Sequence, residues 1–399
     1  MMKLINLVKN LKVIPSKEKV LNRFLELGLP SKKSEAYRYS NVEKLFDKEY
    51  EYIAYPTQEL HHGDRIVIEN GVVISSPKGI RIYSEEFNMD NLNLAQDDPL
   101  YFLGHLLSEH LIVIEIDGDN EIELLHRISK ASTLVNYRIV IKNQKNRHAD
   151  IYEHFEFDNA EDSLLLYGYD MLVKQHSTLT LIKKQHLTEN APDIIASHDI
   201  QVQEHASLML KSFDFGNASA LQLFNIVLEA HATVDMGQLL YIWGNVKRGT
   251  ISKIIHKGQS SHSVQDAKNI LEGSARGIFD ALIKVEHSAK YAKTKQNSKT
   301  ILLGEASYMV AKPQLEIYID ELEASHGATI GQLDVEQLFY LRSRGIHELE
   351  AKKLLIIAFA NQLIETIRDK RQQESINNTF EKAFYAQNKE KQTNIKDTL

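Results

Sequence analysis

The side chains of this chain that could do chemistry are histidines and carboxylates. His326 is the first candidate, because Gly327 and Ala328 follow it and leave the backbone free to turn tightly and the imidazole free to face outward. An imidazole with open coordination positions suits iron. The sequence therefore predicts a glycine-rich turn whose histidine is a candidate iron ligand, with a turn histidine of no function as the alternative.

The sequence contains no cysteine, which limits the cofactors that it can hold. Without cysteine there are no disulfides, no thiolate ligands and no thiol nucleophiles. Iron-sulfur clusters are held mainly by cysteine thiolates, so we expect none to be permanently bound by this chain alone. Any cluster chemistry would need thiolates from a partner.

The sequence lacks the common motifs of catalysis. It has no G-x-x-x-x-G-K-[ST] phosphate loop, no G-x-G-x-x-G after a strand, no H-E-x-x-H and no G-x-S-x-G. Asp320 and Glu321 could act as acid and base or bind a metal, but charged residues at strand ends are common. The stretch GQSSHS, residues 258–263, has no carboxylate at a suitable spacing and is interpreted as a loop. We predict that the chain is not an enzyme.

Composition and charge narrow the class of protein further. A formal net charge of −7 argues against a general nucleic-acid binder, because such proteins need a surplus of Lys and Arg. No apolar run reaches 18 residues, and the first residues lack the apolar region and cleavage site of a secretory signal. We expect a cytoplasmic protein that does not enter a membrane.

Residues 1–110 read as a helical and mixed region. A helix is predicted from about Ser16 and ends at Gly28. Residues 64–83 alternate as strands on either side of Asn70-Gly71, a dipeptide typical of a hairpin turn. Residues 98–109 carry leucines at helical spacing and predict a short helix.

Residues 111–330 read as the β core. About ten short apolar runs recur there without a long helical period, and three triplets that begin at His176, His205 and His231 repeat at spacings of 29 and 26 residues. A repeat of this length favours a solenoid, so the fold class that we predict is mainly β, a right-handed parallel β-helix flanked by helical regions. The three histidines are interpreted as exposed corner residues, with metal binding as the alternative.

Residues 331–372 form the expected C-terminal helical unit. Asp334 can cap a helix, Gln337 stands three residues later, and Gly345 suits the left-handed end of that helix. A second helix is expected from about His347 to Arg371. It is apolar enough to be covered on more than one face, either by its own domain or by another subunit. Residues 373–399 are polar and are expected to fray.

The segment Pro313 to Gly345, PQLEIYIDELEASHGATIGQLDVEQLFYLRSRG, resembles the C-terminal signature of the SufB/SufD family, the scaffold subunits of the SUF iron-sulfur cluster assembly machinery. Its SHGAT and FYLRSRG pieces are similar to the SufD branch. The early patch Glu35 to Tyr39 resembles a cluster found near the start of SufB and SufD chains. The resemblance implies a non-catalytic scaffold with a β-helix core, which pairs with a SufB-like subunit and binds a SufC-like ATPase to support cluster assembly and iron acquisition.

The resemblance also assigns residues. It implies that His326 lies near the contact with the SufB-like subunit, as a candidate ligand of transient iron or of a nascent iron-sulfur cluster. Many family members carry a cysteine where this chain has Ala324, which moves thiolate chemistry to the partner. The partner-binding surface for the SufC-like ATPase is assigned to the first C-terminal helix and its end, namely Phe339, Tyr340, Leu341, Arg342, Arg344 and Gly345.

Three alternatives stay open at this point. A β-helix can also carry a carbohydrate-active enzyme, a lyase or hydrolase, with carboxylates along the solenoid face. The chain could be an interaction scaffold that kept its partners and lost cluster chemistry. It could also form a homodimer when isolated.

Overall fold

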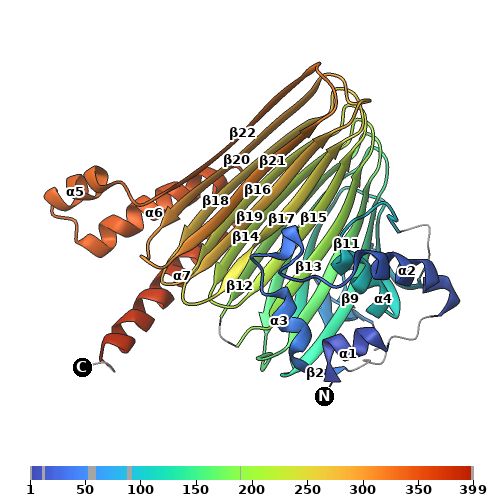
Figure 1. Cartoon of the computed structure of the whole chain (residues 1–399), viewed down its shortest axis with the longest axis horizontal. Helices are drawn as coiled ribbons and strands as arrows, with labels where there is room; N and C mark the ends of the chain where they lie inside the picture. The colour runs from blue at the N-terminus through green and yellow to red at the C-terminus, as the bar shows by residue number, and fades with distance from the viewer. Residues whose placement is uncertain (1, 11–13, 53–59, 88–91, 189, 397–399) are drawn as a thin grey trace.

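The computed structural model describes residues 2–10, 14–52, 60–87, 92–188 and 190–396 (Figure 1). Two long sheets lie against each other and form a flattened β-helix, with helices at the start and the end of the chain. The predicted fold class, a mainly β solenoid with N-terminal and C-terminal helical regions, is confirmed.

The N-terminal elements follow the sequence signals closely. The helix α2 ends before Gly28, whose φ is 75°. The antiparallel strands β4 and β5 are joined by Asn70 and Gly71, with φ values of 48° and 90°. Asp98 caps α4 and accepts a hydrogen bond from the backbone N–H of Leu100. The elements are β1 (Met2–Lys3), α1 (Leu4–Lys9), α2 (Glu18–Leu27), α3 (Val42–Asp47), β2 (Glu49–Tyr52), β3 (His61–His62), β4 (Ile66–Glu69), β5 (Val72–Ser76), β6 (Arg81–Glu86) and α4 (Pro99–Leu107), with 3-10 turns at Pro15–Lys17 and Glu35–Tyr37.

The β-helix places its consecutive strands alternately in the two sheets, and each strand from β7 to β20 pairs in parallel with the strand two places later. Even-numbered strands from β8 to β22 lie in one sheet, and odd-numbered strands from β7 to β21 lie in the other. The strands are β7 (His110–Ile116), β8 (Asn120–Ile128), β9 (Thr133–Asn143), β10 (His148–Phe157), β11 (Leu164–Val173), β12 (Thr178–Leu187), β13 (Asp193–Val202), β14 (Ser207–Gly216), β15 (Ala220–Leu228), β16 (Thr233–Ile242), β17 (Lys247–His256), β18 (His262–Leu271), β19 (Arg276–Val285), β20 (Ala292–Leu302), β21 (Tyr308–Ile317) and β22 (Leu322–Gly331).

The expectation of about ten strands is too low, because the structure describes 16 from β7 to β22. Strand β18 is one of the strands that were missed; it reads HSVQDAKNIL and contains no long apolar run. A search for apolar runs misses strands whose inward side chains are hydroxyls and amides.

The interior of the β-helix changes from apolar to polar along its length. One inward column begins with Leu181, Leu210 and Met236, which are buried and in register on successive coils. The same column continues with Gln265 and Gln296, which are also buried. Burial of aliphatic side chains between coils stabilises the first part, whereas hydrogen bonds satisfy much of the polar part.

The outer faces of the two sheets are covered by different ends of the chain. The N-terminal helices pack on the odd-numbered sheet, where Phe102 and Leu103 of α4 join Leu166 and Ile195 in one apolar cluster. The C-terminal helices pack on the even-numbered sheet, as Figure 1 also shows. The middle of each sheet is therefore buried on both faces.

The C-terminal helices are α5 (Val335–Ser343), α6 (Glu348–Ile364) and α7 (Lys370–Lys396). The expected second helix is too long, because α6 ends at Ile364 and a new helix begins at Lys370. The expected fraying is also wrong for most of the polar end. Ile376 and Phe380 of α7 are buried against the even-numbered sheet, so the helix is held by packing that its composition does not reveal. Residues 397–399 of that end lie outside the described residues. None of the described helices is long and apolar enough to span a membrane.

Candidate functional site

His326 lies on a strand and not in a turn. It sits in the middle of β22, which pairs in parallel with β20 over its whole length. The prediction of a glycine-rich turn is therefore wrong. Gly327 and Ala328 suit a β-strand here because the ladder to β20, which a short sequence window cannot show, fixes their extended backbone.

The register places His326 on the inward face at the open end of the β-helix. Its neighbour on β20 is Gln296, and the next residue in that column is Gln265. Neighbouring residues in register project from the same face of a sheet. Gln296 donates to the side-chain oxygen of Gln265 (3.1 Å), and Gln265 donates to Ser252 (2.8 Å). Two hydrogen-bonded amide side chains therefore lie next to His326 in the same inward column.

A second polar column leads to Ala324, the position where a family cysteine is expected. Ala324 is in register with Thr294, and Thr294 is in register with Ser263. The two hydroxyls are 2.8 Å apart, and the Nε2 atom of His256 lies 2.8 Å from the Ser263 hydroxyl. Burial lowers the pKa of His256 to about 4, so its ring is neutral at pH 7.

Sequence reasoning missed these columns. It treated residues 258–263 as a loop, whereas His262 and Ser263 begin β18. A usable signal was present in β20, because the uncharged residues Thr294, Gln296 and Ser298 are buried. Its lysines at positions 293, 295 and 299, which alternate with this face, are exposed. Such alternation predicts a strand with a polar interior face.

The open end of the β-helix exposes both its sheet edges. Within the described ranges, β21 and β22 are the last strands of their sheets and no further strand pairs with them. Large apolar and aromatic side chains are exposed near this end, as Tyr291, Tyr308, Ile317, Tyr318 and Ile330. Asp320 and Glu321 lie in the connection between β21 and β22, where Glu321 is 3.7 Å from Lys290. An exposed edge of this length is a template for a partner strand.

The helix α5 stands apart from the β-helix (Figure 1). It has no buried residue, and Phe339 and Tyr340 are 72% and 57% exposed. Asp334 caps it by accepting hydrogen bonds from two backbone N–H groups, and Gly345 follows it with a φ of 87°, as predicted. Exposed aromatic side chains of this size are typical of surfaces that bind another protein.

The remaining assigned residues belong to the same helix or its end. Arg344 lies over the ring of Tyr340, 5.2 Å from its centre, and Arg342 lies 3.4 Å from Glu348 at the start of α6. Leu341 is half-buried. The structure therefore brings the predicted docking residues together on one helix and separates them from His326.

The early Glu35 to Tyr39 patch contacts the far end of the core. Lys312 of β21 lies 3.1 Å from Glu35 and 3.1 Å from Asp280. Tyr37 is buried and donates to Asp98, the cap of α4. Glu35 and Lys312 are 277 residues apart in sequence and thus meet at the last strand of the odd-numbered sheet.

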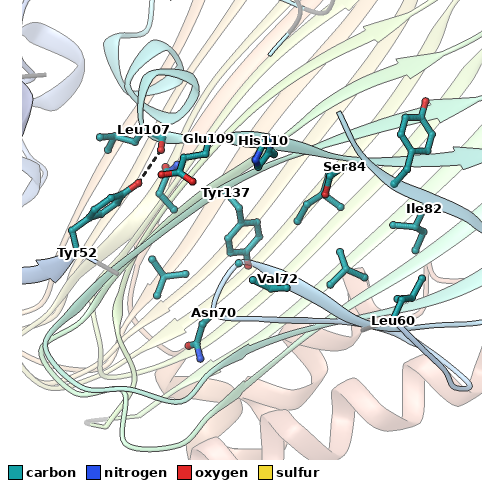
Figure 2. A pocket seen from close by; sticks show the side chains of 16 residues that line it. Tyr52, Leu60, Asn70, Val72, Ile82, Ser84, Leu107, Glu109, His110 and Tyr137 are labelled. Carbon is teal, nitrogen blue, oxygen red and sulfur yellow. Dashed lines mark hydrogen bonds between the residues drawn. The ribbon is translucent and has the colours of Figure 1, made fainter. Parts of the chain in front are cut away.

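A pocket of about 250 Å³ lies at the opposite, N-terminal end of the β-helix. Figure 2 shows Tyr137 directed into it and Tyr52 bonded to the backbone oxygen of Leu107 (3.3 Å). Among the described residues that line it, Glu109 is the single carboxylate. Glycoside hydrolysis usually needs a pair of carboxylates, so this pocket gives no support to the carbohydrate-active alternative.

A second pocket, of about 320 Å³, lies between the N-terminal region and the odd-numbered sheet. It contains more carboxylates, but each has a partner. Asp97 lies 2.6 Å from Lys253, Asp280 lies 3.1 Å from Lys312, and Asp98 accepts from the backbone of α4. These contacts join the N-terminal region to the core, and they too give the carbohydrate-active alternative no support.

Comparison with known proteins gives consistent matches. Residues 126–359 match the family described as "SUF system FeS cluster assembly, SufBD core domain", and residues 3–62 match "SufBD protein N-terminal region". The chain is 28% identical over 381 residues to the iron-sulfur cluster assembly protein SufD of Escherichia coli, which covers 89% of each chain. It is 35% identical over 116 residues to the Bacillus subtilis protein of the same name, which covers 29% of this chain and 26% of that protein.

Proposed function

Because the chain belongs to the SufBD family of the SUF iron-sulfur cluster assembly system, we propose that it is the SufD-like, non-catalytic scaffold subunit of a cytoplasmic assembly complex. In this proposal the chain pairs with a SufB-like subunit and binds a SufC-like ATPase. It holds no permanent cofactor, and iron or a nascent cluster is cargo at the interface with the SufB-like subunit. The observation that carries the proposal is the open end of the β-helix, where an assigned histidine lies on an unpaired sheet edge.

Pairing with the SufB-like subunit is assigned to β21 and β22. Their free edges offer backbone N–H and C=O groups to a partner strand, and a β-helix of the same family can continue both sheets at once. The exposed aromatic residues Tyr308 and Tyr318 are suited to anchor such a contact. A second copy of this chain could cover the same edges, so a homodimer is the competing occupant.

The pairing can be tested at Ile330, which is exposed on β22 and lies in register with Thr300. Ile330→Lys adds a charge at the seam, so the variant should no longer copurify with the SufB-like subunit. Leu25→Lys, an exposed position on α2 at the other end of the molecule, is the matched control. Equal recovery of the SufB-like subunit with both variants would refute the assignment. If the parent protein instead forms a homodimer that excludes the SufB-like subunit, a second copy of this chain covers the edges of β21 and β22.

His326 is proposed to bind iron or a nascent cluster once the partner covers the open end. Its imidazole supplies a nitrogen ligand, and thiolates must come from the SufB-like subunit because this chain has no cysteine. The inward register supports this role, since a ligand at the seam is shielded from water when the end is closed.

The test compares His326→Ala with Ser325→Ala, which lies next to it on the outward face of β22. His326→Ala should lower the iron and sulfide content of the assembled complex without reducing recovery of the SufB-like subunit. The Ser325 variant should keep both. Equal iron content in the two complexes would show that His326 is not an iron ligand.

Docking of the SufC-like ATPase is assigned to α5. The chain lacks nucleotide-binding motifs, so ATP hydrolysis in this proposal needs a separate subunit. Phe339 and Tyr340 present aromatic area to solvent, and Arg342 and Arg344 add the charge typical of interface anchors. The side chain of Asp334 caps α5 and stabilises the helix in the absence of the partner.

Copurification of the ATPase with Phe339→Ala and Arg342→Ala tests this surface. We expect each variant to lose ATPase recovery and to keep the SufB-like subunit, because α5 and the open end are separate surfaces. Leu25→Ala controls for loss of exposed apolar area elsewhere. Unchanged recovery of the ATPase with both α5 variants would overturn the assignment.

A further inference from the structure

Cationic side chains gather where the N-terminal region meets the odd-numbered sheet. The short helix α3 lies over this sheet (Figure 1), and its Val42 and Leu45 join Ile195 of β13 in one apolar cluster. Two of the cations come from a turn of the N-terminal region and from α3, and two are the first residues of β17 and β19. The four are Lys32, Lys44, Lys247 and Arg276.

The two cations of the sheet are direct neighbours. Lys247 and Arg276 are register partners on adjacent parallel strands, so their Cα atoms lie about 4.8 Å apart. Register partners project from the same face of a sheet, and like charges in such positions repel each other. The sheet therefore holds two positive charges together at a cost in stability.

The N-terminal region adds to this repulsion. Burial, together with the positive charges of Arg276, Lys32 and Lys44, lowers the pKa of Lys247. Lys247 is half-buried, because its side chain lines a space of about 20 Å³ between α3 and the sheet, whereas the other three cations are exposed. Packing thus fixes Lys247 at the centre of the group, and the three exposed charges surround it.

Other contacts at the same junction pair opposite charges. Lys48, which follows α3, lies 3.2 Å from Asp193 of β13, and Lys253 of β17 lies 2.6 Å from Asp97. The four gathered cations, by contrast, form no salt bridge with a carboxylate of the described residues. The stability of the junction therefore does not explain why they meet.

We propose that these four side chains form a docking surface for an acidic segment of a partner protein, one that carries several aspartate or glutamate residues. Carboxylates from such a segment would pair with the cations and remove their mutual repulsion, so charge complementarity favours this occupant. In an extended segment the side chains of one face recur about every 6.7 Å, a spacing that long lysine and arginine side chains can follow.

A nucleic acid suits this surface less well. The chain has a formal net charge of −7, and Glu43 accepts a hydrogen bond from the backbone N–H of Lys32 (3.3 Å), which places a carboxylate beside the cations. A continuous phosphate backbone would be repelled there, whereas a peptide has gaps between its charges. The docking surface is separate from His326 and from α5, and it does not depend on the proposed scaffold function.

The experiment measures binding of two short fluorescein-labelled peptides to the untagged full-length protein by fluorescence anisotropy. One peptide alternates glutamate with serine, and the other alternates glutamine with serine. We expect the parent protein to bind the glutamate peptide about tenfold more tightly at about 50 mM NaCl, and the difference to shrink at about 300 mM because salt screens exposed charges.

Two double variants test the residues. Lys247→Gln/Arg276→Gln should bind the glutamate peptide about fivefold more weakly than the parent protein, and Lys32→Gln/Lys44→Gln should act similarly from the N-terminal side. Neither should lower the urea midpoint of unfolding, because each removes charges that repel one another. The matched control removes two exposed lysines elsewhere and should bind like the parent protein; it is Lys19→Gln/Lys78→Gln.

Three results would overturn the proposal. The parent protein could bind the two peptides equally, both surface variants could bind the glutamate peptide like the parent protein, or the control could lose as much affinity as they do. A single-stranded oligothymidylate is the competing probe. If the parent protein binds it more tightly than the glutamate peptide, and the surface variants lose that binding, the surface belongs to nucleic acid and the proposal is wrong.

Discussion

His256 should make this protein less stable in mild acid. It is fully buried in the polar end of the β-helix, where burial lowers its pKa from 6.5 to about 4. Its Nδ1 atom lies 2.8 Å from the Ser261 hydroxyl, which donates to the carbonyl of Gly258. The Ser261 hydroxyl must therefore accept from Nδ1–H, and Nε2 lies 2.8 Å from the hydroxyl of Ser263, which donates to Thr294.

The sign of the effect follows from the two pKa values. Between pH 6.5 and pH 4 the unfolded chain binds a proton at His256 and the folded chain does not, so the unfolding free energy falls as pH falls. The stabilisation is fully present above pH 6.5 and is lost as the pH approaches 4. A pKa difference of 2.5 corresponds to about 3 kcal/mol, of which about 2.5 kcal/mol is lost between pH 7 and pH 4.5.

The assay is urea unfolding of the parent protein and of His256→Gln at a series of pH values from 7 to 4.5. Glutamine keeps a polar side chain but does not titrate, so the variant should lose about 2.5 kcal/mol less than the parent protein over this range. His110→Gln, at an exposed histidine on β7, should follow the parent protein. If His256→Gln and the parent protein lose the same unfolding free energy between pH 7 and pH 4.5, the reasoning is refuted.

Three further predictions concern buried groups in other parts of the molecule. Burial raises the pKa of Asp199 to about 6, so its protonation should raise the free energy of unfolding as the pH falls from 6 to 4. Asp199→Asn should reduce this rise by about 2 to 3 kcal/mol, measured by urea unfolding. Arg248 lies 3.0 Å from Asp214, and both side chains are buried. Arg248→Met leaves the Asp214 charge buried without its partner, so this variant should destabilise the fold by about 3 to 5 kcal/mol in the same assay. The double variant Arg248→Met/Asp214→Leu removes both charges and should destabilise the fold by less. Phe380 of α7 packs edge to face on Phe215, with ring centres 5.3 Å apart; Phe380→Ala should speed amide hydrogen exchange in α7, while unchanged exchange there would show that the helix does not depend on this contact.

Local sequence signals determined the features that depend on a few neighbouring residues. The hairpin at Asn70-Gly71, the cap at Asp334 and the left-handed end at Gly345 were all predictable, because backbone sterics and capping act over a few positions. The histidine repeat predicted the corners of the solenoid for the same reason. The family resemblance was also readable in two short segments, Pro313 to Gly345 and Glu35 to Tyr39, and the family assignment rests on the match over residues 126–359.

The tertiary structure alone decided where the candidate site faces. The register of β22 against β20 places His326 above Gln296, and that register is set by coils stacked about 30 residues apart in sequence. The polar strands β18 and β20 are stable because neighbouring coils satisfy their buried hydroxyls and amides, a condition invisible in a local window. Likewise, α7 is held by a sheet far from it in sequence. Propensity describes single segments, whereas these features depend on which segments the fold brings into contact.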